Sequence, residues 1–185
     1  MEKNEFHLDV VSVRLVNECP VLSRDKVSDP QSAIRVVGNI FKDLDREVVG
    51  VINLRSDGTP INLHVASIGS LNASIVEPRE MLKASILSNA AKLVMVHNHP
   101  SGDVAPSKED IRVTDRMARI CVLVGIELLD HVIVGADNNT YFSFREKGIV
   151  KYAEPIRYVT ELEQLHIDKA AERSRADGDE KIYRR

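Results

Sequence analysis

The chain has 185 residues, with 25 Lys and Arg against 28 Asp and Glu, so its formal net charge at neutral pH is −3. A hydrophobic fraction of 43% is enough for a full core, and the length fits one domain with additional ends. The acidic balance argues against a protein whose main task is non-specific DNA binding, because that task needs a clustered basic surface.

Cysteine usage and the N-terminus bear on the cellular compartment. The two cysteines, Cys19 and Cys121, lie far apart and form no C-x-x-C pair, so neither a cysteine metal site nor a disulfide framework is indicated. Residues 1–5 are mostly charged and lack the apolar segment of a signal peptide, and no apolar run reaches membrane-spanning length. We therefore expect a cytoplasmic protein without a membrane partner.

The first part of the chain predicts one strand and one helix. Apolar residues over Leu8–Val16 favour a strand, and a polar connector follows up to residue 28. Asp29 and Pro30 then indicate a helix start, because Asp is a good N-cap and Pro fits the first helical position. Apolar residues at helical spacing continue this helix to about Leu44.

A hairpin and a second helix follow. Residues 47–54 are rich in branched apolar side chains and predict a strand. The turn at Asp57-Gly58 predicts an antiparallel partner strand over residues 61–68. Pro78 begins the second helix.

The next segments predict a short strand over residues 92–96 and a third helix from Ser107 to Gly125. Two further strands, over residues 128–134 and 140–144, are joined by a turn. The side chains expected on the inner side of the third helix are Ile111, Thr114, Met117, Ala118, Cys121 and Val122.

These elements predict an α/β (α+β) fold with a mixed sheet flanked by helices, because strands and helices intermix without a regular parallel repeat. We expect an N-terminal strand and connector over residues 1–28, a domain over 29–150 and a C-terminal tail over 151–185. Within the tail, residues 161–171 favour a short helix, and the charged residues 172–185 are typical of a mobile end.

The most informative stretch follows the strand over residues 92–96. Side chains alternate along a strand, so His97 and His99 point the same way, with Cα atoms about 6.5 Å apart. Turns at Pro and Gly then lead to the helix that begins at Ser107, and Asp110 lies on its first turn. Two imidazoles, one carboxylate and a free fourth position are typical of a catalytic zinc site rather than a structural one.

Other interpretations of these residues need no metal. Ser107 and Asp110 fit an S-x-x-D variant of the helix capping box. The two histidines could be exposed at a strand end, and Asp103 could simply form a turn. None of these explains why two histidines and a carboxylate converge at the end of one apolar strand.

The spacing resembles the JAMM motif of JAB/MPN metalloproteases, in the form carried by bacterial RadC-type proteins. That motif is His-x-His, seven residues, Ser, two residues, Asp, and it is met here by His97, His99, Ser107 and Asp110. The resemblance extends from about residue 30 to 144 and implies the JAB/MPN fold, which is similar to that of cytidine deaminases. It also implies a zinc ion bound by the two histidines and the aspartate.

The same resemblance implies a general base, a glutamate at the start of an upstream strand. Glu47 matches that position, and Glu80 is the alternative because it lies in Pro-Arg-Glu just before the site. We favour Glu47, since a strand beside the site aims a side chain more accurately than a helix start. Ser107 is expected to stabilise an oxyanion, to cap its helix, or both. Asp103 is expected to support the loop or to orient a histidine.

The neighbouring polar residues receive simpler interpretations. His64 and His131 lie in apolar strands, so we expect core or edge histidines with satisfied hydrogen bonds. Asn98 is expected to face away from the two histidines, because side chains alternate along a regular strand.

We therefore expect a zinc-dependent metallohydrolase of peptidase or isopeptidase type, acting on an unknown protein or peptide. The alternative is a DNA-repair accessory factor of the RadC type that acts by binding. The longer RadC-type proteins resemble a fusion of a helix-hairpin-helix module with this domain. The first 28 residues here are too short for that module. We therefore expect the short RadC form, without the module, and only weak DNA binding. A metal-bound but inactive scaffold is disfavoured by the retained ligands, and N/O ligands leave the identity of the metal open.

Overall fold

The computed structural model describes residues 12–19, 23, 25–41, 44–69, 77–137 and 139–150. In chain order, its elements are α1 (Pro30–Phe41), β1 (Val48–Leu54), β2 (Pro60–Ile68), α2 (Pro78–Leu87), β3 (Lys92–Asn98), α3 (Lys108–Val124), β4 (Glu127–Val134) and β5 (Tyr141–Ser143). No helix in these ranges is long and apolar enough to cross a membrane.

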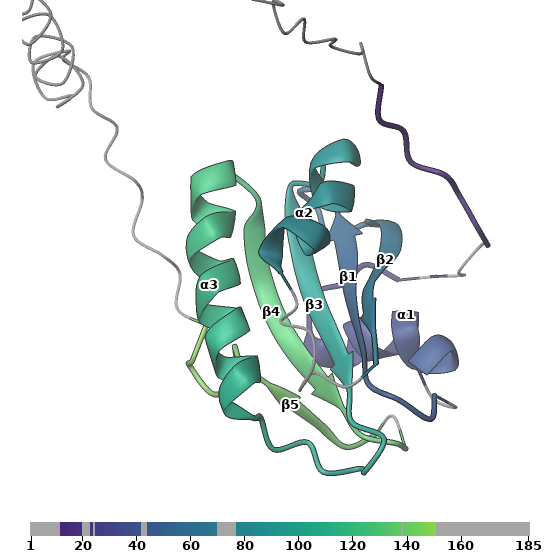
Figure 1. Ribbon diagram of the computed structural model, residues 1–185, viewed down its shortest axis with the longest axis vertical. Helices are drawn as coiled ribbons and strands as arrows, with labels where there is room; N and C mark the ends of the chain where they lie inside the picture. The colour runs from purple at the N-terminus through teal and green to yellow at the C-terminus, as the bar shows by residue number, and fades with distance from the viewer. Residues whose placement is uncertain are drawn as a thin grey trace, which may run out of the picture. The chain divides into compact units, whose positions relative to one another are not determined.

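The strands form one five-stranded sheet in the order β2-β1-β3-β4-β5. The β3 and β4 strands run parallel, and the other three pairs are antiparallel. Helix α1 covers one face of the sheet, and helices α2 and α3 cover the other (Figure 1). The mixed sheet flanked by helices that the sequence predicts is thereby confirmed.

The sheet separates two hydrophobic cores, and β3 contributes to both. Val94 and Val96 pack in the core beneath α1, whereas Leu93 and Met95 pack in the core beneath α2 and α3. All four side chains are at most 2% exposed, which agrees with a central strand covered on both faces. Because side chains alternate along the strand, His97 continues the α2/α3 face.

The signals for helix ends act as the sequence predicts. The Asp29 carboxylate accepts the Ser32 N–H at 2.7 Å and so caps α1. At the start of α3, Ser107 and Asp110 form a reciprocal capping box. Gly125 ends α3 with a φ of 72°, a left-handed conformation that favours glycine.

Two predictions about the elements need correction. The strand predicted over Leu8–Val16 is not formed in its described part, residues 12–16, where the Val16 side chain is 83% exposed and packs on no sheet. Helix α1 extends to Phe41, and the two residues before its predicted end near Leu44 lie outside the described residues. Ile111 is 43% exposed, because Asp110 takes the inward position in the first turn of α3. The segments predicted over residues 151–185 lie outside the described residues.

Replacing Gly125 with Ala should destabilise the protein through backbone conformation alone, because a Cβ there meets no atom within 4 Å. The left-handed conformation costs an L-residue roughly 1–2 kcal/mol, so the free energy of unfolding in urea should fall by about that amount. Gly125→Asn should lose less, since Asn tolerates this conformation better. An Ala variant as stable as the wild type would contradict this account of the helix end.

Candidate metal centre

Strand β3 carries the two histidines to the end of the sheet where β4 also ends. His97 lies opposite Val49 of β1 and Ile133 of β4, so strands hold it on both sides. His99 is the first residue beyond β3, and its N–H donates to the Val134 carbonyl at 3.0 Å. Both backbones are therefore fixed by the sheet rather than by a free loop.

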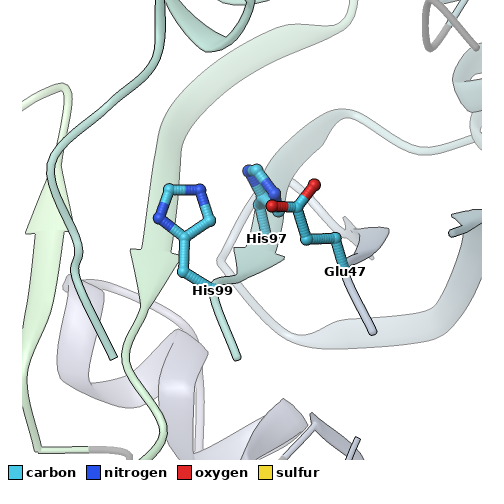
Figure 2. Close-up of side chains that lie close together, drawn as sticks. All are labelled: Glu47, His97 and His99. Atoms are coloured by element: carbon cyan, nitrogen blue, oxygen red, sulfur yellow. The ribbon is translucent and has the colours of Figure 1, made fainter. Parts of the chain in front are cut away.

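The two imidazoles lie close together, edge to face, and Glu47 lies beside them. The ring centroids of His97 and His99 lie 4.6 Å apart with an interplanar angle of 89°. Glu47 directly precedes β1, and one ligand atom from each of Glu47, His97 and His99 lies within 4.8 Å of the others. Figure 2 shows the Glu47 carboxylate turned toward the His97 ring. These three side chains form a group that could hold a metal ion.

Asp110 reaches the same histidines from the first turn of α3. Its Oδ1 lies 3.1 Å from His97 Nδ1, and its Oδ2 lies 3.8 Å from His99 Nε2. The Asp110 side chain is 1% exposed, and its Oδ2 also accepts the Ser107 N–H at 2.8 Å. The capping interpretation and the ligand interpretation of Asp110 are thus compatible in one side chain.

The charge state of Asp110 follows from these contacts. Burial by itself would raise the pKa of the Asp110 carboxyl, but the His97 ring and the hydrogen bonds with Ser107 outweigh it and hold the pKa well below its usual range. Asp110 is therefore an ionised carboxylate at neutral pH.

His97 supplies the observation that tests whether a metal fits. Its side chain is 0% exposed. Its Nδ1 lies beside the Asp110 carboxylate, and its Nε2 has no hydrogen-bond partner among the described residues. Buried polar atoms in native proteins are nearly always hydrogen-bonded, so each exception calls for an explanation. A metal ion is the partner that an imidazole beside a second histidine and two carboxylates would take.

The loop after β3 orients His99. Its Nδ1 lies at hydrogen-bond distance from the backbone carbonyl of Asp103, and because a carbonyl only accepts, Nδ1 carries the proton. The lone pair is then on Nε2, the nitrogen nearer to Asp110. The Asp103 carboxylate accepts the Ala105 N–H at 2.9 Å. Asp103 therefore supports the loop with its side chain and orients a histidine with its backbone, as second-sphere groups of metal sites do.

The structure separates the two glutamates that the sequence left in competition. Glu80 lies on the first turn of α2, where its carboxylate pairs with Lys83 at 2.6 Å and with Arg79 at 3.6 Å. Its backbone carbonyl lies 3.2 Å from His64 Nε2, so that histidine has the partner the sequence predicts. Only Glu47 lies with the paired histidines.

His131 is a residue of this cluster that the sequence interpretation missed. Its ring is stacked near that of His97, with centroids 6.1 Å apart, and lies 4.8 Å from that of Phe144. Its Nδ1 lies 2.7 Å from the Thr114 hydroxyl, but its buried Nε2 has no hydrogen-bond partner among the described residues. The sequence predicts a core histidine whose ring nitrogens are both hydrogen-bonded, and only one of the two is. The parallel pairing of β3 and β4, which the sequence did not reveal, brings the two rings together.

With this geometry established, comparison with known proteins identifies the family. A profile of the RadC-like JAB domain matches residues 27–149. This chain belongs to the RadC-like JAB domain family. Among relatives of this JAB domain, a UPF0758 protein of Halalkalibacterium halodurans is 39% identical over 149 residues, which cover 80% of this chain and 63% of that protein.

Further relatives agree in extent. A UPF0758 protein of Clostridium tetani is 43% identical over 67% of this chain and 54% of its own length, and one of Methanosarcina mazei is 40% identical over 68% and 54%. The chain therefore spans a little over half to under two thirds of the length of these relatives. Their names state no activity, so the chemistry of this RadC-like domain rests on its site.

The burial of His131 predicts a pH-dependent stability. Burial, reinforced by the nearby His97, lowers the pKa of His131 to about 3, whereas an unfolded histidine titrates near ~6.5. Between these values only the unfolded state binds the proton, so stability should fall as the pH drops, by at most about 1.4 kcal/mol per pH unit from this group. Denaturant unfolding in the presence of chelator, from pH 7.5 to 4.5, should give His131→Gln a shallower pH slope than the wild type. Equal slopes would contradict the assignment.

Proposed function

We propose that this RadC-like JAB domain is a zinc-dependent metallohydrolase that cleaves amide bonds in a protein or peptide. The observation that carries the proposal is His97, a fully buried imidazole beside His99 and Glu47. Its Nδ1 lies 3.1 Å from Asp110 Oδ1, and its Nε2 has no hydrogen-bond partner among the described residues. A purely structural role for His97 would leave its buried Nε2 without a partner, at a cost of about 1–3 kcal/mol.

We assign the metal to His97, His99 and Asp110, and keep Glu47 as the proton carrier. Asp110 is buried and ionised and lies within 4 Å of both rings, as suits a permanent ligand. Glu47 is only half buried, so its carboxylate can meet a substrate as well as the histidines. Zinc held by such a set lowers the pKa of a bound water to near ~7 and so makes hydroxide available at neutral pH.

The remaining steps belong to side chains of this chain. Glu47 takes the proton of the attacking water and returns it to the leaving amine, as a general base and then a general acid. Ser107 Oγ accepts the Asp110 N–H at 3.0 Å, which uses a lone pair and leaves the hydroxyl hydrogen for donation. The Ser107 residue is exposed, so this hydrogen can stabilise negative charge on the oxygen of the scissile carbonyl.

The metal assignment predicts about one zinc per chain in the purified protein. The double variant His97→Ala/His99→Ala should lose it, whereas His64→Ala, whose ring contacts the Glu80 carbonyl instead, should keep it. Zinc should also be released as the pH falls below about 6, because a protonated imidazole cannot bind metal. Elemental analysis after gel filtration measures each case. A wild-type protein without metal, or a double variant that retains it, would refute the assignment.

The proton-carrier assignment predicts different effects at the two glutamates. Glu47→Gln keeps the shape of the side chain but accepts no proton, so hydrolysis should fall by roughly 10²–10⁴-fold with metal content unchanged. Glu80→Gln is the matched control, since its carboxylate is engaged with Lys83. Cleavage of a fluorogenic peptide library provides the assay.

Two results would count against this division of roles. Loss of metal in Glu47→Gln would make Glu47 a ligand rather than a base. An inactive Glu80→Gln beside an active Glu47→Gln would move the base to Glu80.

A further inference from the structure

The residue between the two histidines faces the other way. Asn98 is the last residue of β3, and its side chain is 5% exposed. Its Oδ1 accepts the Val48 N–H at 2.7 Å, and its Nδ2 donates to the Arg46 carbonyl at 3.1 Å. These partners lie about 50 residues away in the sequence, and they are the two residues on either side of Glu47.

The backbone at Glu47 is held at a third point. The Glu47 carbonyl accepts the Gly69 N–H at 2.9 Å, just after the end of β2. Glu47 directly precedes β1, so its backbone is held by the Gly69 contact and by the hydrogen bonds of the residues on either side of it. Asn98 makes two of these hydrogen bonds and so contributes to the direction of the Glu47 side chain.

We propose that Asn98 is a positioning residue that aims the Glu47 carboxylate at the metal centre through the backbone of Arg46 and Val48. The inference rests on the function proposed above, because it assigns Glu47 to that centre. Because side chains alternate along β3, the three residues 97–99 have two tasks. His97 and His99 face the proposed metal centre, and Asn98 holds the segment that contains Glu47.

The carboxamide is the group that this position requires. It offers an acceptor to Val48 and a donor to Arg46 from two separate atoms, whereas a carboxylate has no donor and a serine hydroxyl would have to serve both partners from one atom. Val48 is 3% exposed, so its N–H loses its acceptor, with no water to replace it, when Asn98 is truncated. Asn98→Ala should thus release the Glu47 segment while leaving both histidines in place.

The test uses cobalt(II) as the metal probe, because its visible absorption reports the surroundings of the ion without any substrate. We expect wild type, Glu47→Gln and Asn98→Ala each to bind one cobalt ion. The spectra of both variants should shift in the same direction from the wild type. The double variant Glu47→Gln/Asn98→Ala should match Glu47→Gln alone, since Asn98 acts only through Glu47.

Asn53→Ala is the matched control for a merely structural effect. Asn53 is a fully buried asparagine of β1, and its Nδ2 donates to Asn62 at 2.7 Å, away from the histidines. This variant also loses a buried carboxamide, but its cobalt spectrum should equal that of the wild type. Hydrogen exchange adds a direct readout: the Val48 amide should exchange faster in Asn98→Ala and remain protected in Asn53→Ala.

Asn98→Asp covers the case in which Asn98→Ala does not fold. It keeps the acceptor for Val48 and loses the donor to Arg46, so its spectrum should lie between those of wild type and Glu47→Gln. If the cobalt spectrum shifts in Glu47→Gln but not in the Asn98 variants, the inference is overturned and the proposed function still stands. Failure of the wild type to bind cobalt overturns both. If cobalt-loaded Glu47→Gln has the same spectrum as the wild type, both the role of Glu47 and this inference are overturned.

Discussion

The two-residue period of β3 is the constraint on which the site depends. Packing under α1 on one face and under α2 and α3 on the other fixes which side each residue of the strand takes. A slip of one residue would exchange the two valines with Leu93 and Met95 between two close-packed cores of different shape, and the resulting packing mismatch opposes it. The same register sends His97 toward Asp110 and Asn98 toward Arg46 and Val48. The orientation of the polar end of the strand is thus secured by its apolar part.

Stability and function conflict at this end of the sheet. Elsewhere most buried polar groups are paired, as Asp130 is with Ser143 and the Arg145 N–H. His97 and His131 lie near each other, and the Nε2 atom of each ring has no hydrogen-bond partner among the described residues. The hydrophobic register holds both rings in place, and such local violations of polar satisfaction are expected where a protein binds a ligand. Apart from Asn53 Oδ1 in β1, the unpartnered buried side-chain atoms of the described residues therefore gather at this site.

Features with local signals could be predicted from the sequence. The caps at Asp29, Ser107 and Gly125, the hairpin and the facing histidines each follow from neighbouring residues. The stacking of His131 on His97 and the hydrogen bonds of Asn98 depend on which strands pair, which a single sequence does not specify. The role of Glu47 as general base follows from the family resemblance, because no fixed sequence spacing links Glu47 to the two histidines. Ile111 was assigned inward because helical period alone cannot tell that a carboxylate takes the position before it.

Asp110 shows why cap and ligand need not be alternatives. The capping box fixes the side chain by a hydrogen bond to Oδ2, which leaves Oδ1 directed at His97. The Asp110 carbonyl accepts the Thr114 hydroxyl, and because that hydroxyl has one hydrogen, His131 Nδ1 must donate to Thr114. The first turn of α3 is thereby tied to β4 as well as to β3. A cap that only began a helix would need none of these contacts. The role proposed for Asp110 as a metal ligand does need them, because the turn that carries a buried carboxylate sets the direction of that carboxylate.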